Sequence, residues 1–275
     1  MHTVPSDIAV EAARGLSDFL AGKVGKQQAS PDQVEADWHG LWDDLKAGGW
    51  LDVGTELAAE SQDAQLVVDA AYLAEAFSKY LVSLPFVEVL AGQVGDSLAD
   101  QREITVDGTV AVAFPHEQFG DDTAVVDSFA PSLPTADLAV GSVSLRKLQV
   151  EATLRAMGAV SCARAAFTGA VDYSRSRRAY GQVIGSFQAM KHLMADMFVA
   201  LELAESGCVW AANDLDNAFV ICEDVLTRCL WVTGRVIQVY GGIGFTWEGG
   251  THYYVRHILA ALRLNRAMAA LAGSA

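Results

Sequence analysis

The sequence predicts a mainly α-helical protein that carries a small β region in its middle. Long stretches of the 275 residues repeat their apolar side chains with the period of an α-helix. Residues from about 103 to 148 instead hold short β-branched runs set among prolines. With 52% hydrophobic residues, the chain can bury a large core. We therefore expect an N-terminal helical domain (1–102), a reduced β domain (103–146) and a C-terminal four-helix bundle (147–275).

The first 102 residues predict four helices. Apolar residues at helical spacing, with Gly or Pro near the ends, place them at residues 5–26, 31–45, 66–81 and 85–90. In the third helix, Glu75 and Lys79 are four residues apart and are expected to form an ion pair on the face away from the core. The aromatic and aliphatic residues of all four helices are expected to form the core.

The middle region predicts a β-hairpin and two further short strands. Ile104–Val106 and Val110–Phe114 are runs rich in β-branched residues on either side of Asp107-Gly108, a pair that favours a two-residue hairpin turn. Ala124–Val126 and Leu138–Val140 are similar short runs. The region is therefore a small β unit between two helical blocks.

Four long helices are expected from residue 147 onward. Their apolar patterns cover residues 147–173, 186–211, 219–240 and 252–272. Ser186 is suited to cap the start of the second helix, Asn213-Asp214 to end it, and Gly241-Gly242 to end the third. Four apolar helices of this length predict an up-and-down bundle.

Charge is distributed unevenly along the chain, which has a net charge of −15. Residues 1–150 carry 24 acidic and 8 basic side chains, whereas residues 151–275 carry 10 acidic and 11 basic ones. The acidic first half argues against nucleic acid as a partner, because contacts to phosphates need Lys and Arg. An anionic cofactor is therefore expected on the nearly neutral second half.

Several other classes of protein are not indicated. The cysteines lack CxxC spacing and the histidines form no metal-binding motif, so buried free thiols are expected and no metal site is predicted. No apolar run is long enough to predict a membrane span, and the N-terminus does not resemble a secretory signal. The expected location is the cytoplasm.

A basic turn separates the first two helices of the expected bundle. Arg177 and Arg178 follow the first helix, Gly181 permits a turn, and a new helix begins soon after Gly185. A cationic helix end beside a helix N-terminus is typical of a phosphate site. The alternative is a plain corner whose arginines cap carbonyl groups and face water.

Two motifs in this half resemble those of flavin-dependent acyl-CoA dehydrogenases. The first is the Arg-x-x-aromatic-Gly turn Arg177–Gly181, followed by Phe187 and Gln188. The second is the run Gln238–Phe245, which reads QVYGGIGF and is followed by Glu248 and the basic Arg256. The resemblance covers residues 150–263 well, the first hundred loosely and the middle poorly.

The resemblance implies FAD as cofactor and assigns residues to it. Arg177 would pair with the flavin pyrophosphate, and a guanidinium can do so with two hydrogen bonds. Tyr180, Phe187 and Gln188 would line the same pocket, and Gln238, Gly241 and Gly242 would meet the ADP moiety. In the family, these contacts cross a dimer interface and serve the flavin that the neighbouring subunit holds.

Two departures from the family pattern concern the reacting end of the flavin. The middle region contains no Thr-Glu-Pro-like or Trp-x-x-Asn-like flavin loop, and no Tyr-Glu-Gly-Thr-like segment with a catalytic Glu follows Glu248. A minority of the family places that base on the helix before the basic turn, where the matching residue is Glu151. A carboxylate base needs an apolar pocket that raises its pKa. The alternative is that Glu151 is an ordinary carboxylate in the first turn of a helix.

The chain most resembles the short subunits of heterotetrameric α2β2 acyl-CoA dehydrogenases, which oxidise bulky substrates such as steroid side-chain CoA thioesters. The resemblance implies α,β-dehydrogenation of an acyl-CoA thioester, a larger homologous subunit or a second copy as partner, and an electron-transfer flavoprotein as a candidate electron acceptor. Two alternatives stay open. One is a non-catalytic structural or regulatory paralogue without flavin, and the other is a homo-oligomeric enzyme, either a dehydratase or a stand-alone dehydrogenase.

Overall fold

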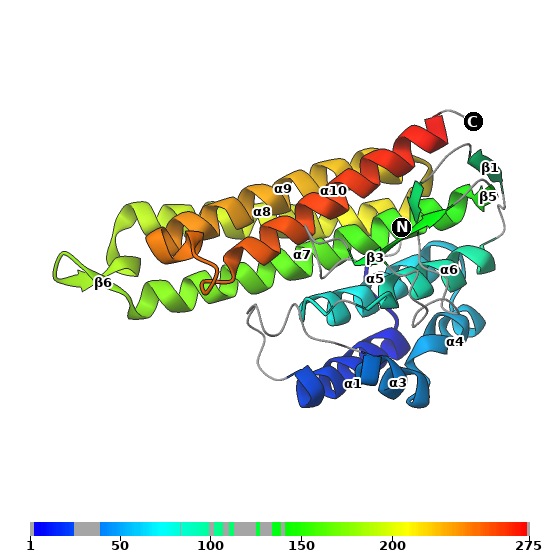
Figure 1. Cartoon of the computed structure of the whole chain (residues 1–275), viewed down its shortest axis with the longest axis horizontal. Helices are drawn as coiled ribbons and strands as arrows, with labels where there is room; N and C mark the ends of the chain where they lie inside the picture. The colour runs from blue at the N-terminus through cyan, green and yellow to red at the C-terminus, as the bar shows by residue number, and fades with distance from the viewer. Residues whose placement is uncertain are drawn as a thin grey trace.

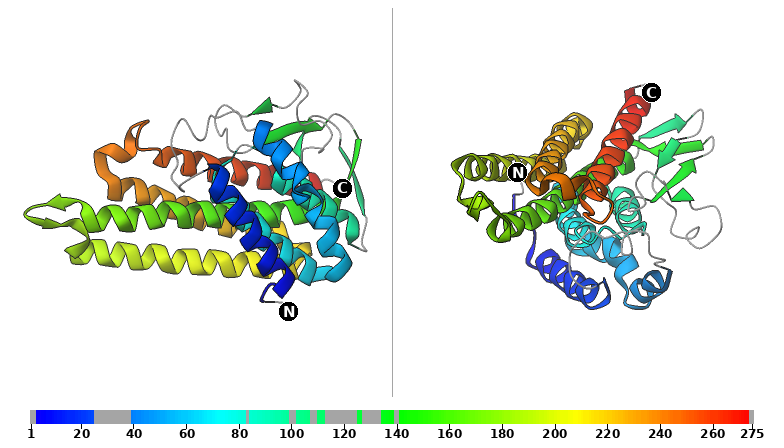
Figure 2. Two further views of the ribbon diagram at one scale, coloured as in Figure 1. Left: turned by 90° about the horizontal axis from the view of Figure 1, so that it is seen from below. Right: turned by 60° about the vertical axis from the view of Figure 1, so that its left-hand side comes forward.

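The computed structural model describes residues 3–24, 39–82, 84–98, 102–106, 110–112, 125–126, 134–138 and 141–273. A bundle of four long helices forms the body of the molecule, and shorter N-terminal helices pack along one side of it (Figure 1). The strands between residues 103 and 144 lie beside the bundle near the end that carries the C-terminus (Figure 2). The described residues are therefore mainly helical, as the sequence predicts.

The N-terminal layer is built from helices and one 3₁₀ turn, Trp50–Asp52. The helices are α1 (Asp7–Val24), α3 (His39–Ala47), α4 (Val53–Glu60), α5 (Asp63–Ser78) and α6 (Phe86–Ser97). Helix α6 is longer than expected, because the apolar pattern that starts after Pro85 continues past Leu90 to the buried Val94. The beginning of the helix expected at 31–45 lies outside the described residues.

The predicted four-helix bundle is confirmed. It consists of α7 (Leu145–Ser176), α8 (Gln188–Asn213), α9 (Ala218–Tyr240) and α10 (Thr251–Gly273). Helix α7 is the central element, because it packs against the other three bundle helices and also against α5 and α6. Helix α9 ends at Tyr240 and Gly241 follows with a φ of 65°, a left-handed value that glycine adopts readily.

The strands pair differently from the sequence expectation. Strand β1 (Glu103–Val106) pairs antiparallel with β5 (Gly141–Ser144). Strand β2 (Val110–Val112) pairs with β4 (Pro134–Leu138), which also pairs with β3 (Val125–Val126). The predicted hairpin between β1 and β2 is therefore wrong, and its turn residues Asp107-Gly108 lie outside the described part of the chain.

Two local predictions are also wrong. Helix α8 begins at Gln188 with Phe187 in the capping position, and the Ser186 hydroxyl donates to the carbonyl of Val183 at 2.6 Å instead of capping the helix. The Lys79 ammonium donates to Ser17 Oγ at 2.5 Å and forms no ion pair with Glu75. In both cases the side chain makes its hydrogen bond to another group of the folded chain.

The bundle interior is mainly apolar and contains the four cysteines, all of which are buried, as expected. Burial raises the pKa of Cys222 to about 12, so its thiol stays protonated at neutral pH. No helix in the described ranges combines the length and the apolar character that crossing a membrane requires. In the same ranges, no three His, Cys, Asp or Glu side chains gather as metal ligands would.

Candidate functional site

The two motifs found in the sequence lie at the same end of the bundle. The basic turn follows the C-terminus of α7, and the glycine-rich run follows the C-terminus of α9, at the end opposite the chain's C-terminus (Figures 1 and 2). The Tyr173 ring of α7 stacks on the Tyr240 ring of α9, with centroids 4.6 Å apart and planes at 28°. Aromatic packing of this kind holds the two helix ends together.

The basic turn is a small β-hairpin. Strands β6 (Arg178–Ala179) and β7 (Gln182–Val183) pair antiparallel across the two-residue loop Tyr180-Gly181. Both loop residues have positive φ, 52° and 82°, as a type I′ turn requires. The side chain of Tyr180 is 98% exposed, so the hairpin presents an aromatic ring to the surroundings of the chain.

Arg177 connects α7 to this hairpin. Its backbone N–H donates to the carbonyl of Tyr173 at 2.8 Å, and its own carbonyl accepts from the N–H of Ile184 at 2.8 Å. Its guanidinium is exposed and has no hydrogen-bond or ion-pair partner among the described residues. The next guanidinium, that of Arg178, instead donates to the carbonyl of Gly181 at 3.1 Å and closes the loop.

Phe187 and Gln188 lie beside the hairpin at the start of α8. The Phe187 ring meets the Tyr180 ring edge-on, with centroids 6.5 Å apart. Gln188 is the first residue of α8 and is exposed. Tyr180, Phe187 and Gln188, which the resemblance assigns to the flavin, thus follow Arg177 closely along the chain.

The second motif offers the exposed side-chain amide of Gln238 and a glycine backbone that a ligand could approach. The Gln238 side chain is exposed, and its Oε1 accepts from Arg235 Nη1 at 3.0 Å. At Gly242, apart from the residue itself and its two chain neighbours, no heavy atom lies within 4 Å of where a Cβ would stand, so a ligand could approach this backbone closely. Gly241 provides the positive φ that turns the chain away from α9.

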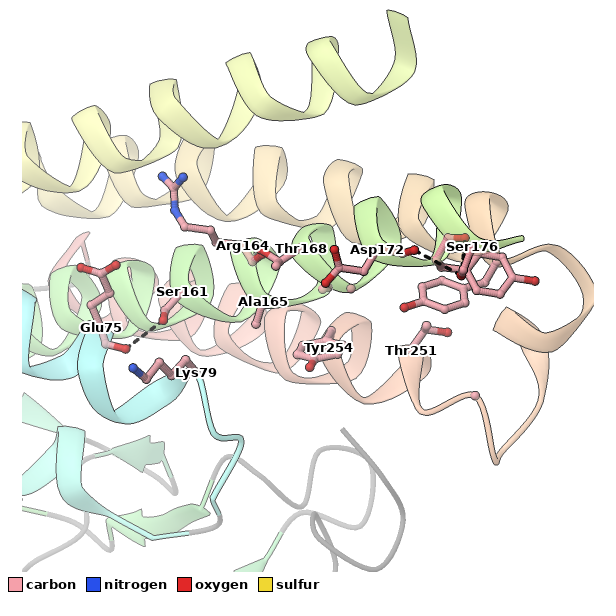
Figure 3. A pocket seen from close by; sticks show the side chains of 15 residues that line it. Glu75, Lys79, Ser161, Arg164, Ala165, Thr168, Asp172, Ser176, Thr251 and Tyr254 are labelled. Atoms are coloured by element: carbon pink, nitrogen blue, oxygen red, sulfur yellow. Dashed lines mark hydrogen bonds between the residues drawn. The ribbon is translucent and has the colours of Figure 1, made fainter. Parts of the chain in front are cut away.

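A cleft of about 580 Å³ lies beside these motifs, between α5, α7 and the start of α10. Glu75 and Lys79 lie at one end of it, and Asp172 and Thr251 toward the other (Figure 3). The stacked tyrosines Tyr173 and Tyr240 also line it. Burial raises the pKa of Tyr240, and the nearby Asp172 carboxylate raises it further. The cleft is therefore lined mainly by hydroxyl and charged groups, with an acid at each end.

This cleft was not expected from the sequence. One signal for it existed, because Ser161, Arg164, Thr168 and Asp172 form a polar stripe at helical spacing on the otherwise apolar α7. Arg164 also pairs with two carboxylates of α8, Glu202 at 3.0 Å and Glu205 at 2.5 Å.

Glu75 was expected on an outer surface, but it lines the cleft. Burial raises the pKa of Glu75, and the neighbouring Glu205 carboxylate raises it further. The cations Arg164 and Lys79 act in the opposite direction and lower the pKa of Glu75.

Glu151, the candidate base, lies in the interior and does not line the cleft. Helix α7 begins at Leu145, so Glu151 is in its second turn, and the residue is only 1% exposed. Its Oε1 accepts from Arg155 Nε at 2.7 Å, and Arg155 Nη2 lies 2.7 Å from the same oxygen. The structure thus brings Glu151 into a buried ion pair, away from the flavin-assigned residues at the far end of α7. Its catalytic role stays a prediction.

Two further ionisable residues complete this buried cluster. Glu88 of α6 places Oε1 2.9 Å from Arg155 Nη2, while its Oε2 has no hydrogen-bond partner in the described part of the chain. Burial raises the pKa of Glu88 to about 7, although Arg155 opposes this, and the pKa of His257 on α10 falls to about 4 through burial and the Arg155 charge. Glu88 is therefore poised to hold a proton near neutral pH, while His257 is neutral.

The C-terminal part of the chain matches known proteins. Residues 141–269 match the family model described as acyl-CoA dehydrogenase, C-terminal domain. The acyl-CoA dehydrogenase FadE34 of Mycobacterium tuberculosis is 34% identical over 142 residues, which are 46% of this chain and 20% of FadE34. The match thus spans about a fifth of that relative's length.

Solved structures are similar over the whole chain. Butyryl-CoA dehydrogenase from Megasphaera elsdenii matches with a TM-score of 0.65 and 15% identity, covering 100% of this chain and 99% of that one. A chain of the ChsE4-ChsE5 complex from Mycobacterium tuberculosis matches with a TM-score of 0.63 and 15% identity, covering 100% and 97%. At this level of identity the likeness establishes the fold, which is that of acyl-CoA dehydrogenases.

Proposed function

We propose that this chain, whose residues 141–269 match the acyl-CoA dehydrogenase C-terminal domain, is a subunit that completes an FAD site for α,β-dehydrogenation of an acyl-CoA thioester. A larger homologous subunit would hold the reacting end of the flavin. One observation carries the proposal: the two motifs assigned to the cofactor meet at one exposed end of the bundle, joined by the Tyr173–Tyr240 stack.

The residues at this end fit the pyrophosphate and adenosine parts of FAD. Arg177 offers an exposed guanidinium, the group that binds phosphate oxygens with paired hydrogen bonds. Gly242 offers backbone without a side chain, and Gln188 and Gln238 offer exposed amides. When bound, FAD would supply the hydride acceptor of the reaction. The role of this chain's residues is to bind and orient the cofactor.

The rest of the assembly is part of the same proposal. One structural neighbour comes from a complex of two differently named proteins, ChsE4 and ChsE5, which supports a heteromeric arrangement here. The sequence resemblance supports a bulky acyl group of the steroid side-chain type and an electron-transfer flavoprotein as acceptor. Glu151 is kept as the candidate base, which requires that its carboxylate leave Arg155 during the reaction.

The test is the visible flavin spectrum of the chain purified alone and after co-expression with the larger acyl-CoA dehydrogenase-like protein of the same genome. We expect stoichiometric flavin only in the complex. Arg177→Ala and Gln188→Ala should lower the flavin content of the complex by at least about tenfold, since each removes a polar contact to the cofactor. Arg175→Ala is the matched control, because this exposed arginine on the last turn of α7 pairs with Asp172.

A lone chain that carries stoichiometric, active FAD would contradict the shared site. The second candidate function is a non-catalytic paralogue, which the buried ion pair of Glu151 favours, because a carboxylate held by Arg155 is not free to abstract a proton. That candidate predicts no flavin in either preparation and no effect of the Arg177 and Gln188 substitutions.

A further inference from the structure

Helix α7 carries a buried cluster of charges that also includes residues of α6 and α10. Arg155 and Glu151 of α7 and Glu88 of α6 are each no more than 3% exposed. Burial and the positive charge of Arg155 lower the pKa of His257 on α10 to about 4, so this neighbour is neutral at pH 7. At that pH the cluster therefore consists of one cation and two carboxyl groups.

One guanidinium serves both carboxyl groups. Arg155 Nε donates to Glu151 Oε1 at 2.7 Å, and Arg155 Nη2 lies 2.7 Å from the same oxygen and 2.9 Å from Glu88 Oε1. A single positive charge offsets a single negative charge. The cluster is therefore electrically neutral when it holds one proton, and it has a net charge of −1 when it holds none. Two carboxyl groups that share a site in this way bind that proton jointly.

Two polar atoms of the cluster make no hydrogen bond. Glu88 Oε2 and Arg155 Nη1 are buried and have no hydrogen-bond partner in the described part of the chain. An ion cluster that serves only the fold is expected to satisfy its buried polar atoms, and unsatisfied ones require an explanation such as a catalytic role. Arg164, nine residues later on α7, also pairs with two carboxylates, Glu202 and Glu205, but at the surface, where water solvates the charges.

The proposed dehydrogenation would change the charge of this cluster. The Glu151 carboxylate would form an O–H bond to the α-hydrogen of the thioester, the C–H electron pair would become the Cα–Cβ double bond, and the β-hydrogen would leave with its electron pair as hydride for FAD. Once protonated, Glu151 no longer offsets the charge of Arg155, and a buried guanidinium without a carboxylate is costly. Glu88 Oε1, already 2.9 Å from Arg155 Nη2, supplies the remaining negative charge.

We propose that Glu88 and Glu151 act as one proton-accepting pair on Arg155, in which Glu151 takes the substrate proton and Glu88 is the positioning residue that keeps the guanidinium paired afterwards. This inference rests on the proposed function and deepens it. The ion pair that holds Glu151 then takes part in the reaction, because the cluster changes from a net charge of −1 to neutrality as the proton arrives.

The protonation of Glu88 agrees with this role. Burial raises the pKa of Glu88 to about 7, the positive charge of Arg155 lowers it, and the negative charge of Glu151 raises it. A proton-accepting group is most effective when its pKa lies near the working pH. A pair that releases its shared proton near neutral pH meets this requirement.

The first test measures the shared proton in the free chain, without flavin or substrate. Difference infrared spectra of the carboxyl C=O stretch should show one buried acid that ionises near pH 7, and Glu88→Gln should remove it. Glu151→Gln should shift its midpoint well below pH 7, because Glu88 then has Arg155 to itself. Glu202→Gln is the matched control: it removes one of the two carboxylates from Arg164 at the surface and should leave the midpoint unchanged. Circular dichroism checks that each variant is folded.

The second test uses the co-expressed complex with the larger FAD-containing subunit and a steroid side-chain CoA thioester as substrate. The kcat of the wild type should rise as the pH increases through about 7, because the pair must first release its proton. Glu88→Gln should lower kcat at least about 100-fold and remove this pH dependence, with KM and flavin content unchanged. Glu88→Asp keeps the charge and should recover part of the loss. A merely structural role would lower the melting temperature and leave the pH profile as it is.

The outcomes separate this proposal from the proposed function. An infrared midpoint that Glu151→Gln leaves unchanged shows that Glu88 titrates alone and overturns the proposal, whatever flavin the complex contains. Wild-type kcat and pH profile in Glu88→Gln, with flavin present, also overturn it and leave the proposed function intact. A shared titration in the free chain, together with a complex that contains no flavin, supports the proton-sharing pair and refutes the proposed function.

Discussion

The two ends of α7 use arginine in opposite ways. Near its N-terminus, Arg155 is 3% exposed and holds Glu88 and Glu151 in the interior. At its C-terminus, Arg177 is exposed and its guanidinium has no partner among the described residues. The same residue type therefore stabilises the fold where water is excluded, and it is available to bind a ligand where water is present.

The physical reason is the cost of removing charges from water. A buried ion pair is costly to form, but breaking it is costlier still, because one charge is then left without solvent or partner. An exposed charge keeps its hydration and contributes little to folding. The position on the helix, not the residue type, decides which of the two applies.

The largest expected effect compares Arg155→Ala with Arg177→Ala. Loss of Arg155 leaves two buried carboxylates without a cation and should lower the free energy of unfolding by roughly 3–5 kcal/mol. Loss of Arg177 should change it by less than about 0.5 kcal/mol. Urea unfolding of both variants at pH 7 measures the difference, and equal losses would contradict the comparison.

A smaller effect concerns the pH dependence of the buried end. The pKa of Glu88 is raised from 4.5 to about 7, so between these values the folded chain keeps a proton that the unfolded chain has released, and stability falls as pH rises. The pKa of His257 is lowered from 6.5 to about 4, so between these values the unfolded chain binds the extra proton, and stability rises with pH. In the wild type the two trends oppose each other.

Glu88→Gln should remove the opposing trend of Glu88 and so make the trend of His257 visible. The free energy of unfolding of the variant is expected to increase by up to about 3 kcal/mol between pH 4 and 6.5, whereas that of the wild type changes less. Urea titrations across about pH 4 to 7.5 test this. Parallel profiles for the two proteins would show that Glu88 does not hold the proton.

The smallest effect concerns the exposed end. Tyr180 occupies the first position of a type I′ loop with a φ of 52°, where Asn is favoured and an aromatic residue is strained. Tyr180→Asn should therefore stabilise the chain by about 0.5–1 kcal/mol, while it lowers flavin retention in the complex. Thermal unfolding and the flavin spectrum check the two parts. A destabilised variant would mean that the Tyr180–Phe187 contact outweighs the backbone strain.

The sequence by itself determined the features that depend on local spacing. Apolar periodicity predicted the four bundle helices, and Gly241 marked the end of α9 because glycine adopts its φ without strain. The two motifs that the resemblance assigns to the cofactor could also be read from the sequence, since each is a short contiguous run. Their residues lie together because helix lengths of similar extent return the chain to the same end of the bundle.

The tertiary structure alone decided features that depend on distant partners. Strand β1 pairs with β5 rather than with its neighbour β2, a choice between nearly equivalent short strands that local propensity cannot make. The sequence places Glu151 near a helix start, but its surroundings come from Glu88 of α6 and His257 of α10, far away in sequence. Burial and charge at a site are sums over such contacts, and so they are set only when the helices pack.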